Sequence, residues 1–378
     1  MLSRSQRTPE VVHFHGNKVA LLLHGGDFFP ALFQALHLAT TSISAEFYII
    51  KPDDTGNTFA QALMDAAARG VEVSLIYDFL GCYDTPSAFF QRLQAAGVQC
   101  LPFNKPVFSK LHWLDIRDHR KVVVIDGITA FLGGLNVGDE YSGFGESFLR
   151  WRDVGLRLDG PAVVELQRLF LTTWKQEGGP GNPGQPEPQA VPIPAGDADV
   201  MIVNGTPHHT RSVIRSSFRV AMTGAIHSIR IVTPYFIPGP RVVRSLLRAV
   251  MRGVKVQLIV PSISDVPTIQ LMSRAYLAPL LDAGVEIYER QGTILHAKVM
   301  LIDDYWVTLG SANFDFRSFH RNYEINVIID SREFGAEVLR MFAEELEKSR
   351  RVALTEYDRG NRFERFLEWM LGPLSRFL

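Results

Sequence analysis

Short apolar runs alternate with amphipathic segments along the sequence, a pattern typical of α/β proteins. Runs of four to eight residues rich in Val and Ile predict buried strands, and segments with apolar residues three and four apart predict helices. This alternation predicts an α/β sandwich built on a mixed sheet. In the first half the expected strands are residues 19–23, 43–50, 71–77 and 98–101, and the expected helices are residues 29–38, 58–69, 86–96 and 163–174.

The second half repeats this order. Residues 252–259 repeat the glycine and apolar positions of residues 69–76, and residues 282–287 repeat those of residues 95–100. Repetition over such a length indicates duplication of a whole domain. The further elements expected here are helices at residues 210–222 and 241–252 and a strand at residues 228–233.

A stretch rich in proline and glycine separates the two halves. Residues 178–196 contain six prolines, which favours a surface linker between domains, although a crossover loop is equally consistent. We therefore expect an N-terminal domain at residues 1–177, a linker at 178–196 and a C-terminal domain at 197–378. The two tandem sandwich domains would be related by a pseudo-two-fold axis, with one active site at their interface.

One polar motif occurs once in each half. Both copies have the form H-x-K-x4-D-x6-G-[GS]-x-N with identical spacing, which chance does not easily produce twice in one chain. The first copy contains His119, Lys121, Asp126, Gly133 and Asn136, and the second contains His296, Lys298, Asp303, Gly310 and Asn313.

The spacing within the motif suits a phosphate site. Residues two apart on a strand face the same side, so His119 and Lys121 are expected to point together, as are His296 and Lys298. Lysine supplies charge, asparagine supplies neutral donors, and histidine supplies a nucleophile or a proton. Two copies imply that one histidine attacks phosphorus while the other protonates the leaving oxygen, so we expect a bell-shaped dependence of rate on pH.

Composition narrows the classes of protein that remain. The 378 residues suffice for two cores, and a net charge of -1 gives no overall positive field of the kind that favours nucleic acid. Cys82 and Cys100 do not form a disulfide framework, which fits a reducing compartment. The first 16 residues are polar, and no uncharged run approaches the roughly 20 residues that span a bilayer. We expect any action on lipid to take place from the membrane surface.

Two segments are candidates for lipid contact. Residues 363–378 carry apolar side chains at helical spacing between arginines, which predicts either a helix packed on the body or an interfacial membrane helix. Residues 103–113 contain aromatic and lysine side chains, and a loop folded over the active site is an equally good interpretation.

The duplicated motif resembles that of the phospholipase D superfamily, and the chain from about Val19 onward resembles bacterial cardiolipin synthases more closely. The resemblance implies a short family member without the membrane-spanning N-terminus that some members have. The segments that carry it are residues 117–121, 131–136, 151–153, 160–163, 234–238, 295–298, 311–313 and 322–324.

The resemblance also implies roles for individual residues. His119 would be the nucleophile, and His296 the acid that protonates the leaving glycerol and later the base that activates the incoming hydroxyl. Asp153 and Glu324 would orient the histidines, as carboxylates on the far ring nitrogen do. Asp126 and Asp303 would support turns. Phosphate oxygens would be held by Lys121, Lys298, Asn136 and Asn313.

The function implied is transfer of a phosphatidyl group, joining two phosphatidylglycerol molecules with release of glycerol. The alternatives are a phospholipase D hydrolase, a nuclease using the same site, and a catalytically inactive lipid-binding protein. No cofactor or metal is expected, because phosphohistidine chemistry with two lysines needs neither. The expected partners are anionic phospholipid and the membrane surface, with no nucleic acid, and the expected location is cytoplasmic, on the inner face of the cell membrane.

Overall fold

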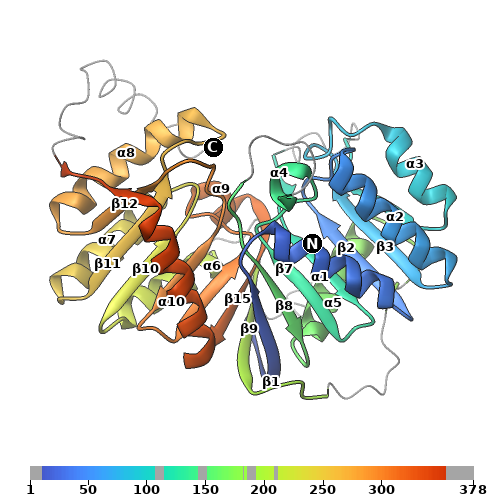
Figure 1. Ribbon diagram of the computed structural model, residues 1–378, viewed down its shortest axis with the longest axis horizontal. Coiled ribbons are helices and arrows are strands. Elements are labelled where there is room, and N and C mark those ends of the chain that lie inside the picture. The colour runs from blue at the N-terminus through green and yellow to red at the C-terminus, as the bar shows by residue number, and fades with distance from the viewer. Residues whose placement is uncertain are drawn as a thin grey trace, which may run out of the picture.

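A computed structural model describes residues 11–106, 115–143, 151–181, 183–184, 193–207 and 212–354. Helices cover both faces of one long mixed sheet that runs through both halves of the molecule (Figure 1). Two segments were predicted to contact lipid. All of residues 363–378, and residues 107–113 of the segment 103–113, lie outside the described residues. So do Asn182 and residues 185–192 of the predicted linker, and the division of the chain there stays a prediction.

The N-terminal half supplies the strands of one end of the sheet, and most of their buried side chains are apolar. Its elements are β1 (Val11–Leu22), α1 (Gly25–Leu38), β2 (Ser42–Phe47), α2 (Asp54–Ala68), β3 (Glu72–Asp78), α3 (Ser87–Ala95), β4 (Gln99–Phe103), β5 (Arg117–Asp118), β6 (Lys121–Ile125), β7 (Thr129–Gly133), α4 (Asp139–Ser142), β8 (Gly155–Asp159) and α5 (Val163–Gln176).

The C-terminal half repeats this succession without a counterpart of β5 and adds one short edge strand. Its elements are β9 (Ala198–Gly205), α6 (Val213–Gly224), β10 (Ser228–Val232), α7 (Gly239–Met251), β11 (Lys255–Pro261), α8 (Pro267–Asp282), β12 (Glu286–Arg290), β13 (Val299–Ile302), β14 (Trp306–Gly310), α9 (Phe316–His320), β15 (Asn322–Asp330), α10 (Arg332–Glu347) and β16 (Ser349–Arg351).

The order of strands shows the internal two-fold symmetry. Outward from the centre it is β1, β8, β7, β6, β2, β3, β4 in one half and β9, β15, β14, β13, β10, β11, β12 in the other. The register matches as well, since Ile43 pairs with Ile125 as Ile229 pairs with Ile302. The α/β fold with two tandem related halves is therefore as predicted, and most predicted elements are present within a few residues.

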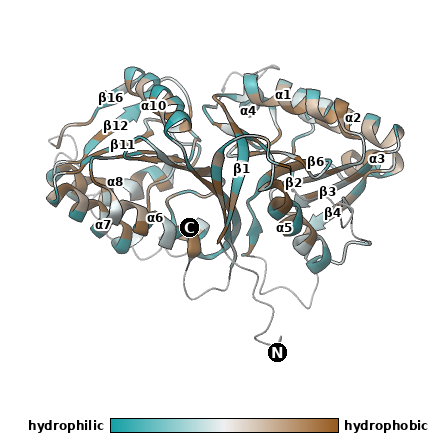
Figure 2. Cartoon of the chain, turned by 90° about the horizontal axis from the view of Figure 1, so that it is seen from below, coloured by the Kyte–Doolittle hydropathy of each residue, from teal (hydrophilic) through white to brown (hydrophobic). Residues whose placement is uncertain are grey.

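The halves meet at an antiparallel pairing of β1 with β9, which joins them into one sheet. Figure 2 shows α1, α2 and α3 on one face of the N-terminal half and α5 on the other, while α6, α7 and α8 lie opposite α10 in the C-terminal half. One apolar cluster contains buried residues of both halves, among them Leu156, Val200 and Leu309. This shared core fixes the two halves against each other.

The two aspartates of the motifs support turns at the sheet edge remote from the histidines, as predicted. Asp126 accepts hydrogen bonds from the backbone of Thr40, Thr41 and Ser42, and Asp303 from the backbone of residues 226–228. Both take left-handed backbone angles, with φ of 51° and 50°. In the described part of the chain, no helix is both long and apolar enough to cross a membrane.

Candidate active site

The two motifs lie at the same edge of the sheet, where β6 and β13 begin. The histidines are not strand residues, contrary to the expectation: His119 and His296 precede strands that begin at Lys121 and Val299. Each lysine turns back on its own histidine. Lys121 Nζ donates to the carbonyl oxygen of His119 at 2.7 Å, and Lys298 Nζ donates to the carbonyl oxygen of His296. The ammonium groups are thus held beside the imidazoles even though the segments are not regular strands.

The backbone of each histidine is bound by the other half of the molecule. The His119 amide donates to the Tyr323 carbonyl at 2.9 Å, where β5 pairs in parallel with β15. Correspondingly, the His296 amide donates to the Arg152 carbonyl at 2.7 Å. This exchange takes the histidine segments out of their own strands and aligns both at the junction of the halves.

The carboxylates are exchanged in the same way. Glu324, in the C-terminal half, lies 3.0 Å from Nδ1 of His119, and Asp153, in the N-terminal half, lies 2.6 Å from Nδ1 of His296. Both carboxylates are fully buried. With Nδ1 of each ring donating to a carboxylate, Nε2 is the nitrogen left for chemistry at phosphorus. Asp153 and Glu324 therefore contact the histidines, as the resemblance implied, in a pairing that the sequence did not specify.

Burial lowers the pKa values of both histidines and both lysines. Desolvation, together with Lys121 and Lys298, lowers the pKa of His119 to about 4 despite the opposing effect of Glu324. Burial likewise lowers the pKa of Lys121 to about 7 and that of Lys298 to about 8. The influence of Lys298 on His119 shows that the two motifs share one electrostatic environment. Such a site, crowded with cationic groups, favours a bound anion.

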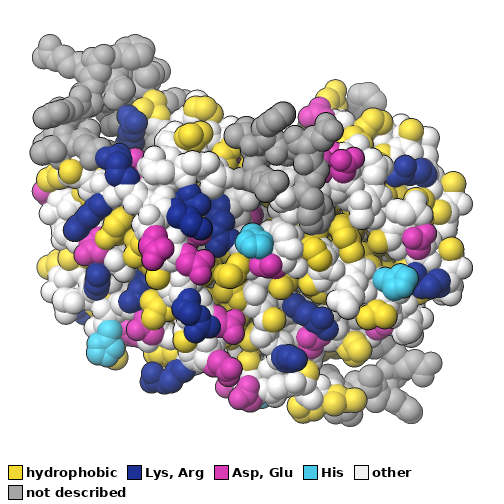
Figure 3. Space-filling model, viewed as in Figure 1, with side chains coloured by type: hydrophobic (Ala, Val, Ile, Leu, Met, Phe, Trp, Pro, Cys, Tyr) yellow, Lys and Arg dark blue, Asp and Glu magenta, His cyan; other side chains and the backbone are white. Residues whose placement is uncertain are grey.

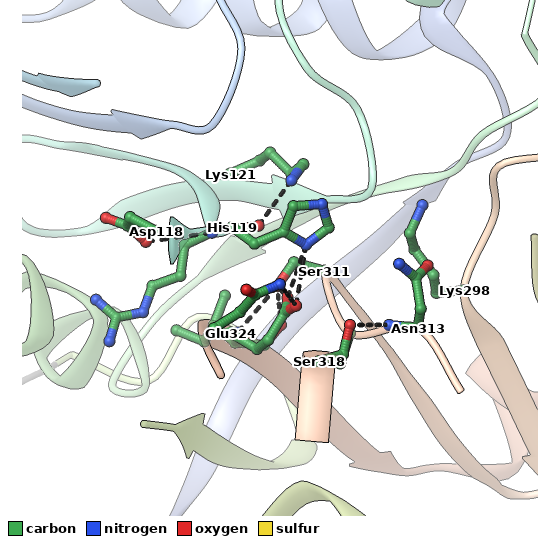
Figure 4. Close-up of polar contacts among 12 residues, drawn as sticks. Asp118, His119, Lys121, Lys298, Ser311, Asn313, Ser318 and Glu324 are labelled. Carbon is green, nitrogen blue, oxygen red and sulfur yellow. Dashed lines mark hydrogen bonds and ion pairs between the residues drawn. The ribbon is translucent and has the colours of Figure 1, made fainter. Parts of the chain in front are cut away.

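The asparagines differ between the copies. Asn136 is held by the Ile49 amide at 3.2 Å and donates to the Tyr141 hydroxyl at 2.9 Å. The backbone amide of Asn313 donates to Ser318 Oγ at 3.1 Å. Its side-chain Oδ1 is buried without a hydrogen-bond partner among the described residues. Figure 4 shows Asn313 and Lys298 together on one side of the His119 ring in that view. Each side-chain amide retains an N–H donor that no contact among the described residues uses.

Aromatic rings around the histidines were not predicted. Tyr48 packs its ring against His119 with the centroids 4.9 Å apart, whereas Trp151 and Tyr141 lie 5.2 and 5.6 Å from His296. No spacing in the sequence marks these residues, because they come from three separate segments of the chain. They shield the imidazoles from water and make the environments of the two histidines unequal.

Behind His119 lies a buried arginine that has no counterpart in the second motif. Arg120 is 2% exposed and its guanidinium donates to Glu46 at 3.1 Å, Thr173 at 2.9 Å and Asn204 of β9 at 3.0 Å. The corresponding residue of the second motif is Ala297. Arg120 therefore anchors the first motif across the junction between the halves.

Comparison with solved structures gives the class of fold. The chain aligns with a phosphatidylserine synthase of Haemophilus influenzae at a TM-score of 0.69 over 95% of this chain and 94% of that one, with 12% identity. A polyphosphate kinase of Porphyromonas gingivalis aligns at a TM-score of 0.62 over 96% of this chain and 54% of that one, with 13% identity. At such identities the likeness is one of fold.

Sequence comparison then defines the family. The family model described as cardiolipin synthase, PLD-like domain, matches residues 32–174 and 219–346, and the chain belongs to this family. The cardiolipin synthase of Geobacillus thermodenitrificans is 36% identical over 83% of this chain and 63% of its own length. That of Geobacillus kaustophilus is 35% identical over 90% and 68%. The chain thus spans about two thirds of the length of these relatives.

Proposed function

We propose that the protein is a phosphatidyltransferase of the cardiolipin synthase type, which joins two phosphatidylglycerol molecules and releases glycerol. The observation that carries this proposal is the pair of histidines, each held through Nδ1 by a buried carboxylate of the other half. Family membership and cardiolipin synthases at 35–36% identity support the choice of substrate class.

In the proposed reaction His119 Nε2 attacks phosphorus of the first phosphatidylglycerol. The bond from phosphorus to the glycerol oxygen breaks, and His296, as imidazolium, gives that oxygen a proton. Neutral His296 then removes the proton from a hydroxyl of the second phosphatidylglycerol, whose oxygen displaces His119 from phosphorus. Asp153 stabilises the His296 imidazolium and Glu324 fixes the tautomer of His119.

The lysines and asparagines would hold the non-bridging phosphate oxygens. Lys121 and Lys298 are both buried, with lowered pKa values that an anionic phosphodiester would raise again. Charge that builds on these oxygens in the transition state is stabilised by donors already in place, an effect worth about 3 kcal/mol per donor. Asn136 and Asn313 add neutral donors to the same set.

The proposed setting is the surface of the cell membrane, on its cytoplasmic side, with anionic phospholipid as the partner. On the face seen in Figure 3, acidic and basic side chains are interspersed, which fits the net charge of -1 and does not favour a nucleic-acid partner.

The test is incubation of the purified protein with phosphatidylglycerol vesicles and analysis of the lipids by mass spectrometry. We expect cardiolipin and glycerol in equal amounts, and neither from the His119→Ala variant. A product dominated by phosphatidic acid would show that the protein is a hydrolase and not a transferase. Cleavage of DNA would show that it is a nuclease.

A further inference from the structure

A cluster of basic side chains lies in the C-terminal half and takes no part in the proposed reaction. This basic cluster consists of Arg215 and Arg219 on α6, Arg241 on α7 and His320 on α9. The guanidinium of Arg215 lies 2.7 Å from Nε2 of His320. Arg241 lies on α7, which packs against α6. Burial lowers the pKa of both Arg215 and His320, and Arg241 lowers both further. The cluster therefore brings together three separate helices.

The basic cluster lies on the same edge of the sheet as the two motifs. β9 ends at Gly205, which pairs with Glu324, and α6 begins eight residues later. β10 ends at Val232, which pairs with Val299 directly after Lys298, and α7 begins beyond it. The helix α9 starts three residues after Asn313. A ligand at the basic cluster would therefore be a neighbour of the reaction centre.

The positive charge of the cluster is not balanced within the described residues. None of Arg215, Arg219 and Arg241 has a carboxylate within ion-pair distance there, and Nε of Arg219 is buried without a hydrogen-bond partner. The nearby Arg317 and Arg321 differ, because Asp115 pairs with both, at 3.0 and 2.8 Å. Burial and the surrounding arginines lower the pKa of His320 to about 4.

Comparison of the two halves shows that this charge is specific to one of them. Arg215 and Arg241 lie in the first turns of α6 and α7, where the helix dipole disfavours cations. The related helices of the N-terminal half carry Asp27 and Asp54 in their first turns. The arrangement is thus electrostatically unfavourable when empty and becomes favourable when an anion is bound among the arginines.

We propose that the basic cluster binds the phosphate group of an anionic phospholipid, at a position separate from the phosphorus that reacts between the two histidines. Planar guanidinium groups bind phosphate oxygens through paired hydrogen bonds, and His320 adds a ring nitrogen beside Arg215. The choice of a lipid as the source of the phosphate rests on the proposed function; the phosphate chemistry rests on the cluster alone.

The test compares two variants of equal charge in a His119→Ala background, so that no lipid is turned over. The double variant Arg215→Gln/Arg241→Gln removes two charges from the cluster. Its matched control, Arg244→Gln/Arg248→Gln, removes two exposed charges from α7 alone. Binding is measured by flotation with phosphatidylcholine vesicles with and without phosphatidylglycerol. We expect the cluster variant to bind phosphatidylglycerol vesicles about 10-fold more weakly, and the control to change by less than about 2-fold.

A second measurement separates free phosphate from lipid as the ligand. Inorganic phosphate is titrated while the ring resonances of His320 are followed by NMR. We expect a shift that saturates in the parent protein and is lost in the cluster variant. If phosphate binds but the parent protein and the cluster variant bind phosphatidylglycerol vesicles equally well, the site takes a soluble phosphate and the lipid proposal is wrong.

Three results would overturn the inference. Equal loss of vesicle binding in the two double variants would indicate general charge attraction, and unchanged binding would indicate no site. Binding of a single-stranded oligonucleotide that depends on the cluster, in place of vesicles, would assign it to nucleic acid. Circular dichroism and thermal melting check the fold, and the single variant Arg241→Gln serves if the double variant unfolds. Vesicle binding needs no turnover, so an absence of cardiolipin synthesis would reject the proposed function alone.

Discussion

Glu324 of the C-terminal half holds Nδ1 of His119 in the N-terminal half at 3.0 Å. The reverse exchange places Asp153 on His296. Each histidine therefore has a fixed ring orientation only when both halves are present, and the reaction centre belongs to neither half by itself. This relationship leads to predictions for the carboxylates, for a glycine beside one of them, and for the stability of the molecule.

Replacement of either carboxylate by its amide should reduce turnover while leaving the fold intact. Glu324→Gln and Asp153→Asn keep the side-chain size but remove the charge that fixes the tautomer and stabilises imidazolium, so kcat should fall by about 10²- to 10⁴-fold. The measurement is initial rate against lipid concentration. Asp159→Asn, which changes a carboxylate paired with Arg157 on β8, is the control and should stay near the parent rate. Retention of half the activity in both site variants would contradict the roles assigned.

Gly134 should be required for activity, because a larger residue at this position would collide with Asp153. A Cβ at this position would lie 2.3 Å from Asp153 Oδ1, so Gly134→Ala should push the carboxylate away from His296. In the second motif Ser311 takes the same place and its hydroxyl donates to Glu324. We expect activity to fall by at least about 10-fold, since displacement of a positioning group by a fraction of an ångström is costly.

The matched control is Gly224→Ala at the end of α6, where an added Cβ meets nothing within 4 Å. This variant should keep full activity and melt at or slightly above the parent temperature. Equal activity of the two glycine variants would show that the space beside Asp153 is unimportant.

Arg120 should contribute more to the stability of the fold than an arginine in a partly exposed ion pair does. Arg120→Met would leave the buried carboxylate of Glu46 without its ion pair, and removal of one partner of such a pair typically costs about 3–5 kcal/mol. Unfolding in urea measures this change. Arg157→Gln, which breaks a pair that is half exposed on the arginine side, should cost at most about 1 kcal/mol. Similar losses in the two variants would exclude an anchoring role for Arg120.

The pKa of His119 predicts how stability depends on pH. Its folded pKa of about 4 lies below the ordinary value of 6.5, so the folded state favours the neutral ring. The resulting stability is fully present above pH 6.5 and is lost as the pH falls toward 4. Melting temperatures between pH 7.5 and pH 4.5 should therefore fall more steeply for the parent than for His119→Gln. Replacement of the exposed His37 is the control, and parallel curves for all three proteins would contradict the prediction.

The motif and the repeat allowed the fold and a set of candidate site residues to be predicted, because short apolar runs and fixed polar spacings are visible in the linear sequence. The strand β15 was not predicted. Nor were β8 and β9. The buried residues of β15 include Asn322, Glu324 and Asn326, which interrupt its apolar positions and leave a run of only three, residues 327–329. Those polar side chains are buried because they serve the site and the neighbouring strand.

The sequence also did not reveal that each half supplies the carboxylate that contacts the histidine of the other half. Spacing within one motif indicates which side chains share a face, but the partner of His119 lies 205 positions away. The same limit applies to Tyr48, Tyr141 and Trp151, whose rings reach the histidines only through tertiary packing. The expectation that the histidines belong to strands failed because the other half takes over their backbone hydrogen bonds.

The central claim is a covalent bond between phosphorus and His119. The most direct test is to stop the reaction without acid or heat and to analyse the peptides by mass spectrometry. With phosphatidylglycerol vesicles, we predict a phosphatidyl adduct on the peptide that contains His119 in the parent protein. The same adduct should form more slowly in His296→Ala, which lacks both the acid for its formation and the base for its breakdown, and should be absent from His119→Ala. An adduct on His296, or cardiolipin formation by the His119→Ala variant, would contradict the account.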